Sequence, residues 1–490
     1  MNENNTDKGF RKIDFFMLGL GAMIGVGWTV SLNNWFLTAG GVLGTILAFA
    51  LGTLAVIPIG LTYGELTGAL PVSGGSMAFA YRAEGSRFSF LGGWTVALAY
   101  IVLLPWEIIY INKILNILFP ILRSGEPLYV FLGNPIYLPS LVTGILITLG
   151  LSYLNLKGSE MSGKIQTHLT SIIIVVALVL MGFLLTKADF ANLKPVYKPI
   201  EGYDHKSFFT GFINMLVIVP FFLAGFDAIP QAIEDARAGV KPRTISKLLV
   251  LSIVAAGLFY IGIITTSGLA LSWEEFATLD TPALAFVFKD YFNGWLGQGL
   301  YYLTLIGALA GLLSTYNGMF IASSRLLHSM GRAQLLPKVF AKESKFGTPL
   351  IGILFSTLAT LVGVFLGSPV IKPLTNVGST AFVLAWLITS YSALSLRKKE
   401  PNLDRPIQAG ENRFIIYLAV AISGLLILLS LLPMSPGFMG RESLLILIAW
   451  LLLGAIFYFV SNRTGETISE RRRHRLIFGE LSKRVRKRRK

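Results

Sequence analysis

The sequence predicts an all-α polytopic membrane protein with about twelve transmembrane helices. Of its 490 residues, 53% are hydrophobic and 14% are charged, and a water-soluble domain of this size would have to expose much of that apolar surface. The chain also contains many apolar runs of about 20 residues, the length needed to cross a hydrocarbon core with every backbone polar group bonded internally. Finally, Lys and Arg alternate between loops, as they do in multi-pass membrane proteins.

The expected spans lie between charged or Pro/Gly-rich breaks. In the first half they run over 13–38, 41–66, 90–119, 136–156, 165–186 and 207–235. In the second half they run over 245–271, 295–329, 348–367, 374–396, 413–432 and 441–460. An even number of crossings places both termini on the same side of the membrane.

Charge indicates which side that is. Most of the 42 Lys and Arg residues lie in the N-terminus 1–12, in the even-numbered loops and in the tail 461–490. Positive residues accumulate in cytoplasmic loops, so we expect a plasma-membrane protein with both termini in the cytoplasm. The net charge of +16 is then a topology signal, and no nucleic-acid partner is needed to explain it. The N-terminus has no apolar core or cleavage pattern of a removable signal peptide.

The basic tail 461–490 allows two interpretations. Its Arg and Lys residues could lie on anionic lipid headgroups. A solvated, disordered end explains the composition equally well.

Residues for catalysis are missing from the sequence. Cysteine is absent, and the four histidines are too scattered for a ligand cluster. We find no paired-carboxylate motif or nucleophile elbow, which argues against an enzyme and against a metal or organic cofactor.

Two spans carry clusters of helix-breaking residues. Gly19, Gly21, Gly25 and Gly27 fall within nine residues of the first span, and the segment 220–227 of the sixth span combines proline, glycine and an acid. Small residues also permit close helix packing, which is the alternative explanation for each cluster alone. Their pairing favours unwound segments, because the two spans begin successive sets of five helices, 13–200 and 207–397, with 413–460 as an additional pair.

An unwound segment offers backbone N–H groups to an anion and free carbonyls to a cation. An amino acid carries both charges. The sequence therefore predicts a site for a zwitterion that needs no general base or nucleophile.

Four motifs carry a resemblance to a known family. They are Met23–Gly27; Phe221–Ala228 with the charged segments 234–237 and 241–243; residues 71–76 with Tyr81 and Gly85; and residues 314–317, 323–327, 330–332 and 336–337. In their order along the chain they resemble the amino acid-polyamine-organocation permeases. The resemblance implies a LeuT-like five-plus-five inverted repeat with broken first and sixth helices.

It also implies secondary active transport of an amino acid or related small amine by alternating access, through proton-linked symport or exchange. A polyamine or organic-amine exchanger is the alternative. A ligand-binding membrane sensor is a candidate from another class, although the tail is too short to form a signalling domain.

The resemblance assigns roles at the two breaks. Backbone donors of Ile24, Gly25, Val26 and Gly27 would meet the substrate carboxylate, and carbonyls around Phe222, Ala224 and Gly225 would take the ammonium. Phe221 matches an aromatic residue that caps the substrate. With Phe226, Trp28 and Trp106, these rings favour a partly apolar pocket and a neutral amino acid.

Several acidic residues lie within the spans, among them Asp227, Glu107 and Glu65. Asp227 is a candidate for coupling, and hydrogen bonding to unwound backbone explains it equally well. Glu107 lies about 15 residues past the start of the third span, or about 22 Å along it at 1.5 Å per residue, which predicts an outer-vestibule position with a coupling, gating or substrate-contact role. Glu65, at the end of the second span, is expected to be a solvated or interfacial charge.

The energy source stays open between a proton and a sodium gradient. Some proton-driven relatives place a lysine near the position of Ile173, where this chain is apolar, so lysine-based coupling is not expected. Ser314 and Thr315 have hydroxyls that suit sodium, but such side chains commonly bond their own helix. The sequence does not indicate an oligomeric state.

Overall fold

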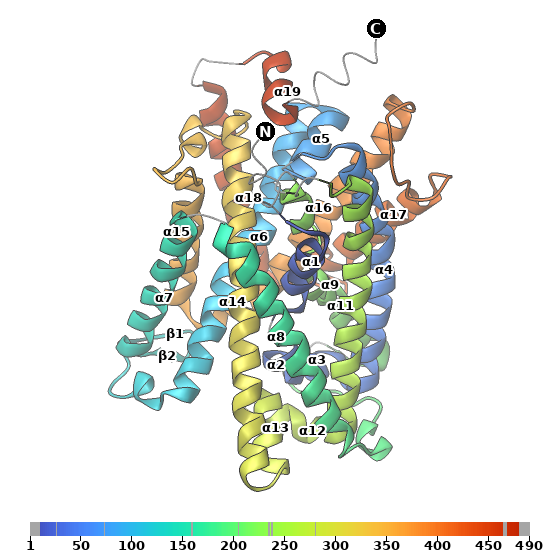
Figure 1. Ribbon diagram of the computed structural model, residues 1–490. Coiled ribbons are helices and arrows are strands. Elements are labelled where there is room, and N and C mark those ends of the chain that lie inside the picture. The colour runs from blue at the N-terminus through green and yellow to red at the C-terminus, as the bar shows by residue number, and fades with distance from the viewer. Residues whose placement is uncertain are drawn as a thin grey trace.

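The computed structural model describes residues 10–25, 27–72, 74–157, 160–203, 205–233, 236, 239–279, 281–463 and 468–479 (Figure 1). Within these ranges, 11 helices are long and apolar enough to cross a membrane. A further apolar helix, Leu350–Leu366, has 17 residues. These helices correspond one by one to the twelve expected spans, which confirms the all-α polytopic membrane fold.

The crossing helices differ from the predicted spans mainly at their ends. Ten of them are α4 (Val42–Ala69), α6 (Ser86–Leu118), α7 (Leu138–Lys157), α8 (Glu160–Leu185), α11 (Pro242–Ala270), α14 (Gly294–Arg332), α15 (Leu350–Leu366), α16 (Ile371–Lys399), α17 (Phe414–Leu431) and α18 (Arg441–Arg463).

The first and sixth crossings are interrupted. The first consists of α1 (Lys12–Ile24), α2 (Gly27–Val30) and α3 (Leu32–Ala39). The sixth consists of α9 (Phe208–Leu223) and α10 (Ala228–Gln231). Both interruptions fall where the glycine patterns predicted them. The inverted relation between the two sets of five helices remains a prediction.

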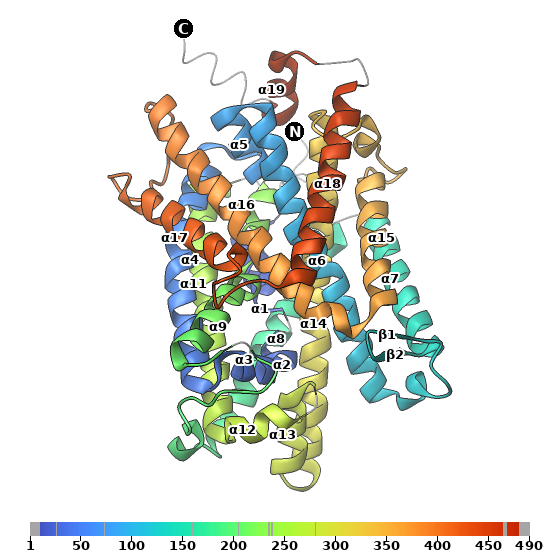
Figure 2. The ribbon, with the colours of Figure 1, turned by 180° about the vertical axis from the view of Figure 1, so that it is seen from behind.

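Helix α6 forms the centre of the bundle. The most apolar window of this helix is 89% buried, whereas the corresponding windows of α17 and α18 are 28% and 17% buried. In Figure 2, α18 lies in front of α6, and α17 lies on the outside of the bundle beside α16 and α4. A helix that is apolar on all sides must be covered by protein or lipid, and α6 is covered by protein.

Several short elements complete the fold. They are α5 (Ser76–Glu84), η2 (Pro120–Arg123), β1 (Tyr129–Phe131), β2 (Asn134–Ile136), η3 (Phe190–Leu193), α12 (Trp273–Thr278), α13 (Ala283–Tyr291), η5 (Lys338–Ala341), η6 (Ser368–Val370) and α19 (Glu470–Phe478). Strands β1 and β2 pair antiparallel, with Tyr129 opposite Ile136. The hairpin, α12 and α13 lie at the end of the bundle opposite α19 (Figure 1). We call these ends the hairpin end and the α19 end.

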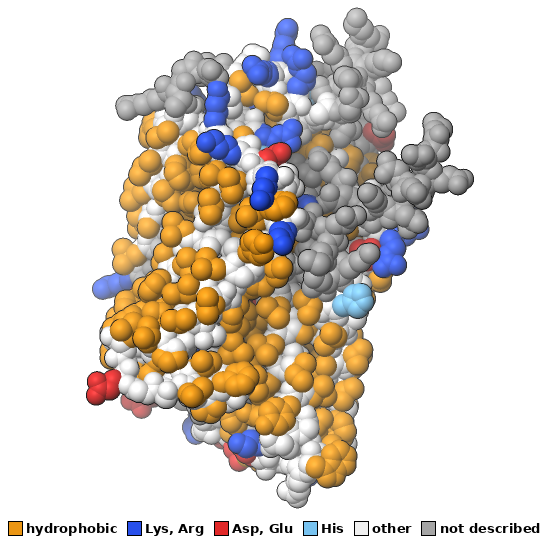
Figure 3. Space-filling view, turned by 60° about the vertical axis from the view of Figure 1, so that its left-hand side comes forward, with side chains coloured by type: hydrophobic (Ala, Val, Ile, Leu, Met, Phe, Trp, Pro, Cys, Tyr) orange, Lys and Arg blue, Asp and Glu red, His pale blue; other side chains and the backbone are white. Residues whose placement is uncertain are grey.

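The surface agrees with a lipid environment. Leu54, Leu146 and Leu358 are among the large hydrophobic side chains that are exposed on the crossing helices. On the face shown in Figure 3, hydrophobic side chains cover most of the area, and Lys and Arg lie mainly toward one end. Scattered exposed leucines are ordinary in soluble proteins, but such an extensive apolar surface requires a bilayer.

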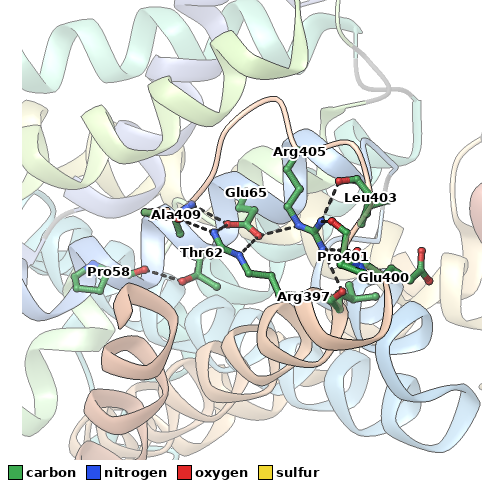
Figure 4. Close-up of polar contacts among 11 residues, drawn as sticks. Pro58, Thr62, Glu65, Arg397, Glu400, Pro401, Leu403, Arg405 and Ala409 are labelled. Carbon is green, nitrogen blue, oxygen red and sulfur yellow. Dashed lines mark hydrogen bonds and ion pairs between the residues drawn. The ribbon is translucent and has the colours of Figure 1, made fainter. Parts of the chain in front are cut away.

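The prediction that Glu65 is a solvated or interfacial charge is wrong. Its carboxylate is fully buried and accepts bonds from Arg397 at 2.9 and 2.5 Å, while Arg405 Nε lies 3.1 Å away (Figure 4). The backbone N–H of Ala409 donates to it at 2.7 Å. Glu65 thus holds the end of α4 to α16 and to the loop after it. Its partners are more than 330 positions away in the sequence, so local hydropathy could not reveal them.

Part of the basic tail is folded, contrary to the interpretation of the tail as a solvated, disordered end, while contact with lipid headgroups remains a prediction. Helix α19 packs on α5, where the hydroxyl of Tyr81 donates to Glu470 Oε2 at 2.6 Å and Arg82 Nη1 lies 2.7 Å from His474 Nε2. Phe478 is buried against Tyr81, with ring centroids 6.2 Å apart. The remaining basic run, 483–490, lies outside the described residues.

Candidate functional site

The first break is the gap between α1 and α2. Gly25 has φ +40° and ψ −140°, a conformation that glycine adopts without the penalty of a Cβ atom. The hydroxyl of Tyr260 donates to the carbonyls of Met23 and Ile24 at 2.8 and 2.9 Å, so two carbonyls released at the end of α1 find a partner. Val26 lies outside the described residues.

The second break is the segment 224–227 between α9 and α10. Ala224 is extended, with φ −77° and ψ 151°, and Gly225 has φ +127°. Pro220 lies inside the last turns of α9 and removes one backbone donor there. Proline and glycine together therefore end the helix in mid-crossing.

The second break packs directly on the last turn of α1, next to the first break. A Cβ atom at Gly225 would lie 2.7 Å from the carbonyl carbon of Ala22, so the main chains touch with no side chain between them. A Cβ atom at Gly27 would lie 2.7 Å from the ring of Phe222. Glycines of both broken helices thus permit the two crossings to pack closely beside their breaks, at a place that we call the junction.

Aromatic side chains surround this junction in two groups. Phe222 packs edge-on against Trp35 with ring centroids 4.8 Å apart, and Phe221 lies 5.4 Å from Trp106. Phe226 faces the other way, toward Tyr63 and Trp386, at 5.4 Å from each. The structure therefore brings Phe221 and Phe222 together near Gly27 and places Phe226 apart from them.

Glu107 lies beside the first break, and the outer-vestibule prediction is wrong. Its side chain is buried, and its Oε1 atom would be 3.9 Å from a Cβ atom at Gly25. Its second oxygen, Oε2, has no hydrogen-bond partner among the described residues. Helix α6 begins at Ser86 rather than at residue 90, and position along one helix does not reveal the depth at which another helix breaks. A buried polar atom without a partner is rare in folded proteins and marks a candidate functional group.

Asp227 is buried, and both of its oxygens are engaged. Oδ1 accepts from the N–H of Gly225 at 3.2 Å, and Oδ2 accepts from the hydroxyl of Tyr100 at 2.9 Å. The carboxylate therefore bonds to the backbone of its own break and, through Tyr100, connects the break to α6.

Sequence reasoning missed Gln166 and Tyr260. Gln166 Nε2 donates to Ser314 Oγ at 2.7 Å and would lie 2.9 Å from a Cβ atom at Gly21. Thr315 Oγ1 donates to the carbonyl of Gly21 at 3.4 Å. The polar groups that α8 directs toward α1 thus include the amide of Gln166 and the hydroxyl of Thr170, which donates to the carbonyl of Met17 at 3.2 Å, while Ile173 is buried in the core. Neither contact has a local sequence signal, because each joins residues far apart in the chain.

Cavities lie on both sides of the junction. Trp35, Tyr110 and Phe222 belong to the lining of one of about 180 Å³, and Leu18, Gln166 and Gln231 to that of a smaller one of about 40 Å³. Of the predicted substrate residues, Phe222 lines the first cavity, and none lines the second. The breaks and their aromatic neighbours therefore separate two cavities.

The comparison with known families decides the identity of this fold and site. A model of the amino acid permease family matches residues 11–457. This chain belongs to the amino acid permease family. The match covers both breaks, and the family's members are transporters rather than enzymes. The permease is accordingly a membrane transporter of amino acids or related small molecules.

Curated relatives of this permease have several names. It is 26% identical over 467 residues to the branched-chain amino acid permease BcaP of Bacillus subtilis, covering 93% of both chains. It is 25% identical to the methylthioribose transporter of the same organism, with 93% of this chain and 94% of that one covered. It is 23% identical to the aromatic amino acid transport protein AroP of Escherichia coli K12, with 94% and 97% covered.

Proposed function

We propose that this permease moves a neutral amino acid with an apolar side chain across the plasma membrane by alternating access, as a proton-linked symporter or an exchanger. The observation that carries the proposal is the junction of the two broken crossings, where the main chain of Gly225 in the second break touches that of Ala22 in the last turn of α1. The unwound backbone at each break, next to this contact, offers N–H groups to a carboxylate and carbonyls to an ammonium. Both termini are assigned to the cytoplasm from the loop charges.

The aromatic residues support a neutral, apolar side chain. Phe222 lines the cavity next to the junction, and Phe221 packs against Trp106 within the same group. Such rings favour an apolar partner and offer no counter-charge. Two of the relatives are named for branched-chain and aromatic amino acids, which agrees with this chemistry.

The two cavities support alternating access. Each lies on a different side of the junction, so small movements of the surrounding helices would connect the site to one side of the membrane and then to the other. The inverted repeat, 13–200 with 207–397, is the proposed basis of this symmetry.

Uptake into proteoliposomes tests the proposal. Gly25→Leu adds a side chain where φ is +40° and where a Cβ atom would already meet Thr315 Oγ1 at 3.0 Å, and we expect it to abolish uptake. Gly182→Leu is the matched control, because Gly182 is exposed on α8 with no atom within 4 Å of its Cβ position. Wild-type uptake by the Gly25→Leu variant would overturn the junction as the substrate site.

A second candidate, the exchange of an organic amine, rests on Glu107. Its carboxylate, with Oε1 beside Gly25 and Oε2 without a hydrogen-bond partner among the described residues, would suit an ammonium group without a carboxylate. A panel of leucine, phenylalanine, alanine, putrescine and methylamine separates the candidates. Uptake of the diamine and the amine but not of the amino acids would favour this alternative.

A further inference from the structure

A third cavity, with a polar lining, lies on the side of α6 that faces away from the junction. It encloses about 420 Å³ between the end of α6, the start of α7, the hairpin and the turn after α15. The lining residues that matter here are Asn112, Lys113, Asn116, Arg123, Tyr137 and Ser140. These elements lie at the hairpin end of the bundle (Figure 1).

Helix α6 separates this cavity from the junction of the two breaks. With 3.6 residues per turn, Asn112, Lys113 and Asn116 point roughly 120–180° away from Glu107. Glu107 lies beside Gly25, so these three side chains lie on the opposite side of α6. The cavity is therefore no part of the proposed substrate site.

Two cations line the cavity without an acidic partner. Lys113 is half-buried, and its ammonium lies 5.1 Å from the ring centroid of Tyr110. Arg123 is exposed at the mouth, 5.8 Å from the ring centroid of Tyr137. None of the ion pairs within the described ranges involves either cation. Two like charges facing one cavity, one of them partly desolvated, disfavour each other unless an anion joins them.

Hydroxyl donors also line the cavity, together with Asn112 and Asn116, whose amide oxygens have no partner among the described residues. Ser140 Oγ accepts from Asn116 Nδ2 at 3.2 Å, which leaves its own hydrogen available. Asn112 Nδ2 donates to the carbonyl of Ser140 at 3.2 Å and so fixes this residue against α6. The hydroxyl of Tyr137, another lining residue, makes no hydrogen bond within the described residues. Cations and hydroxyl donors are the groups that hold an oxyanion.

We propose that this cavity binds a phosphate group, either of a free phosphate or of a phospholipid headgroup. A phosphate carries one to two negative charges and several acceptor oxygens, which match the two cations and the two hydroxyls. Bound there, it joins Lys113 on α6 to Arg123 and Tyr137, which flank the hairpin.

Thermal unfolding of the full chain tests the proposal. The delipidated protein in dodecyl maltoside, a detergent without phosphate, is measured with sodium phosphate against sodium chloride at equal ionic strength. At about ten times the Kd, phosphate is expected to raise the Tm by roughly 1–2 °C. Lys113→Gln and Arg123→Gln should lose this shift. Lys187→Gln should keep it, because Lys187 is an exposed cation of the same end, outside the cavity.

Added phosphatidylglycerol distinguishes the two sources. If a lipid headgroup is the ligand, phosphatidylglycerol raises the Tm of the wild type, remains bound in native mass spectra and leaves no further shift for free phosphate. A wild type that responds to neither compound, or Lys113→Gln and Arg123→Gln variants that respond as the wild type does, would overturn the proposal. Arg123→Gln alone decides the matter if Lys113→Gln fails to fold, since Arg123 is exposed.

Discussion

Gly225 in the second break lies directly on the main chain of Ala22 in α1: a Cβ atom at Gly225 would be 2.7 Å from the carbonyl carbon and 2.9 Å from the carbonyl oxygen. Gly225 and Ala22 are 203 residues apart in the sequence. Their helices cannot move away from each other, since both are buried in the bundle. Their relative position therefore depends on the absence of one methyl group.

Gly225→Ala is expected to reduce uptake at least tenfold and to lower the Tm. The new methyl group would overlap backbone rather than a flexible side chain, and φ of +127° is unfavourable for alanine. Gly424→Ala in α17 is the control, because nothing lies within 4 Å of its Cβ position. Uptake and Tm measured side by side should separate the two variants. Equal behaviour would show that the breaks can move apart without cost.

Asp227→Asn is expected to impair proton-driven uptake and substrate counterflow to the same extent. Both carboxylate oxygens already accept bonds, from Gly225 N–H and from the Tyr100 hydroxyl, and an amide keeps only one acceptor. Tyr100→Phe should show a weaker version of the same defect. Counterflow that survives while gradient-driven uptake disappears would instead assign Asp227 to proton coupling.

Uptake is expected to stay within twofold when choline replaces sodium at constant pH. The amide of Gln166 directs an N–H donor at Ser314 Oγ, and Thr315 donates to the carbonyl of Gly21, so the hydroxyls proposed as sodium ligands are engaged. A cation at this position would have to compete with those contacts. Strict dependence on sodium, removed by Ser314→Ala, would contradict this expectation.

Glu65→Gln is expected to destabilise the protein by about 3 kcal/mol, because it leaves Arg397 and Arg405 buried without their counter-charge. In a double-mutant cycle of thermal unfolding, Glu65→Gln with Arg397→Gln should cost less than the sum of the single changes. Glu274→Gln removes the exposed pair with Lys198 and should cost well under 1 kcal/mol. An additive cycle would show that Glu65 and Arg397 contribute independently.

Acid is expected to loosen α5 from its partners. The hydrogen bond to Lys399, followed by that to Ser395, lowers the pKa of Glu84. Burial raises the pKa of Glu470, but the bond from Tyr81 and the charge of Arg473 outweigh it, so this pKa is also lowered. A lowered folded pKa means that these contacts stabilise the folded state fully above the ordinary glutamate pKa of 4.5 and lose that effect as the pH falls through the folded values.

Spin labels measure this loosening without background, because the chain has no native cysteine. Labels at Arg87→Cys and Arg475→Cys report the distance between the start of α6 and α19, and a His474→Gln background removes imidazole protonation. We expect a narrow distance distribution at pH 7 that broadens below pH 4.5. Adding Glu470→Gln to the labelled protein should weaken this broadening. If the labelled protein with Glu470 intact shows the same distance distribution at every pH, the prediction is contradicted.

The sequence revealed the breaks because their cause is local. Gly25 and Gly225 adopt positive φ angles and Pro220 removes a backbone donor, so each weakens the helix through its own chemistry. Hydropathy located all twelve crossings. It did not reveal what faces the breaks. Tyr260 looked like one aromatic residue among many in an apolar span.

Partners distant in the chain account for the errors. Glu65 has its arginines on α16 and in the loop after it, and Glu107 meets Gly25 across two separate helices. Helix α19 is too short and polar for hydropathy to detect. It packs against the bundle through the two buried residues at its end, Ile477 and Phe478. For Glu65, Glu107 and the charges of α19, tertiary packing determines an environment that the local sequence predicted to be solvent.

The contact of Gly225 with Ala22 also limits how this protein can diverge. Every substitution at Gly225 adds a side chain where two main chains touch, so almost no substitution is tolerated at this position. The rings of Phe221, Phe222 and Trp106 lie nearby and can be exchanged one at a time. New substrate ranges, in nature or in directed evolution, should therefore arise through the rings while the glycines stay fixed.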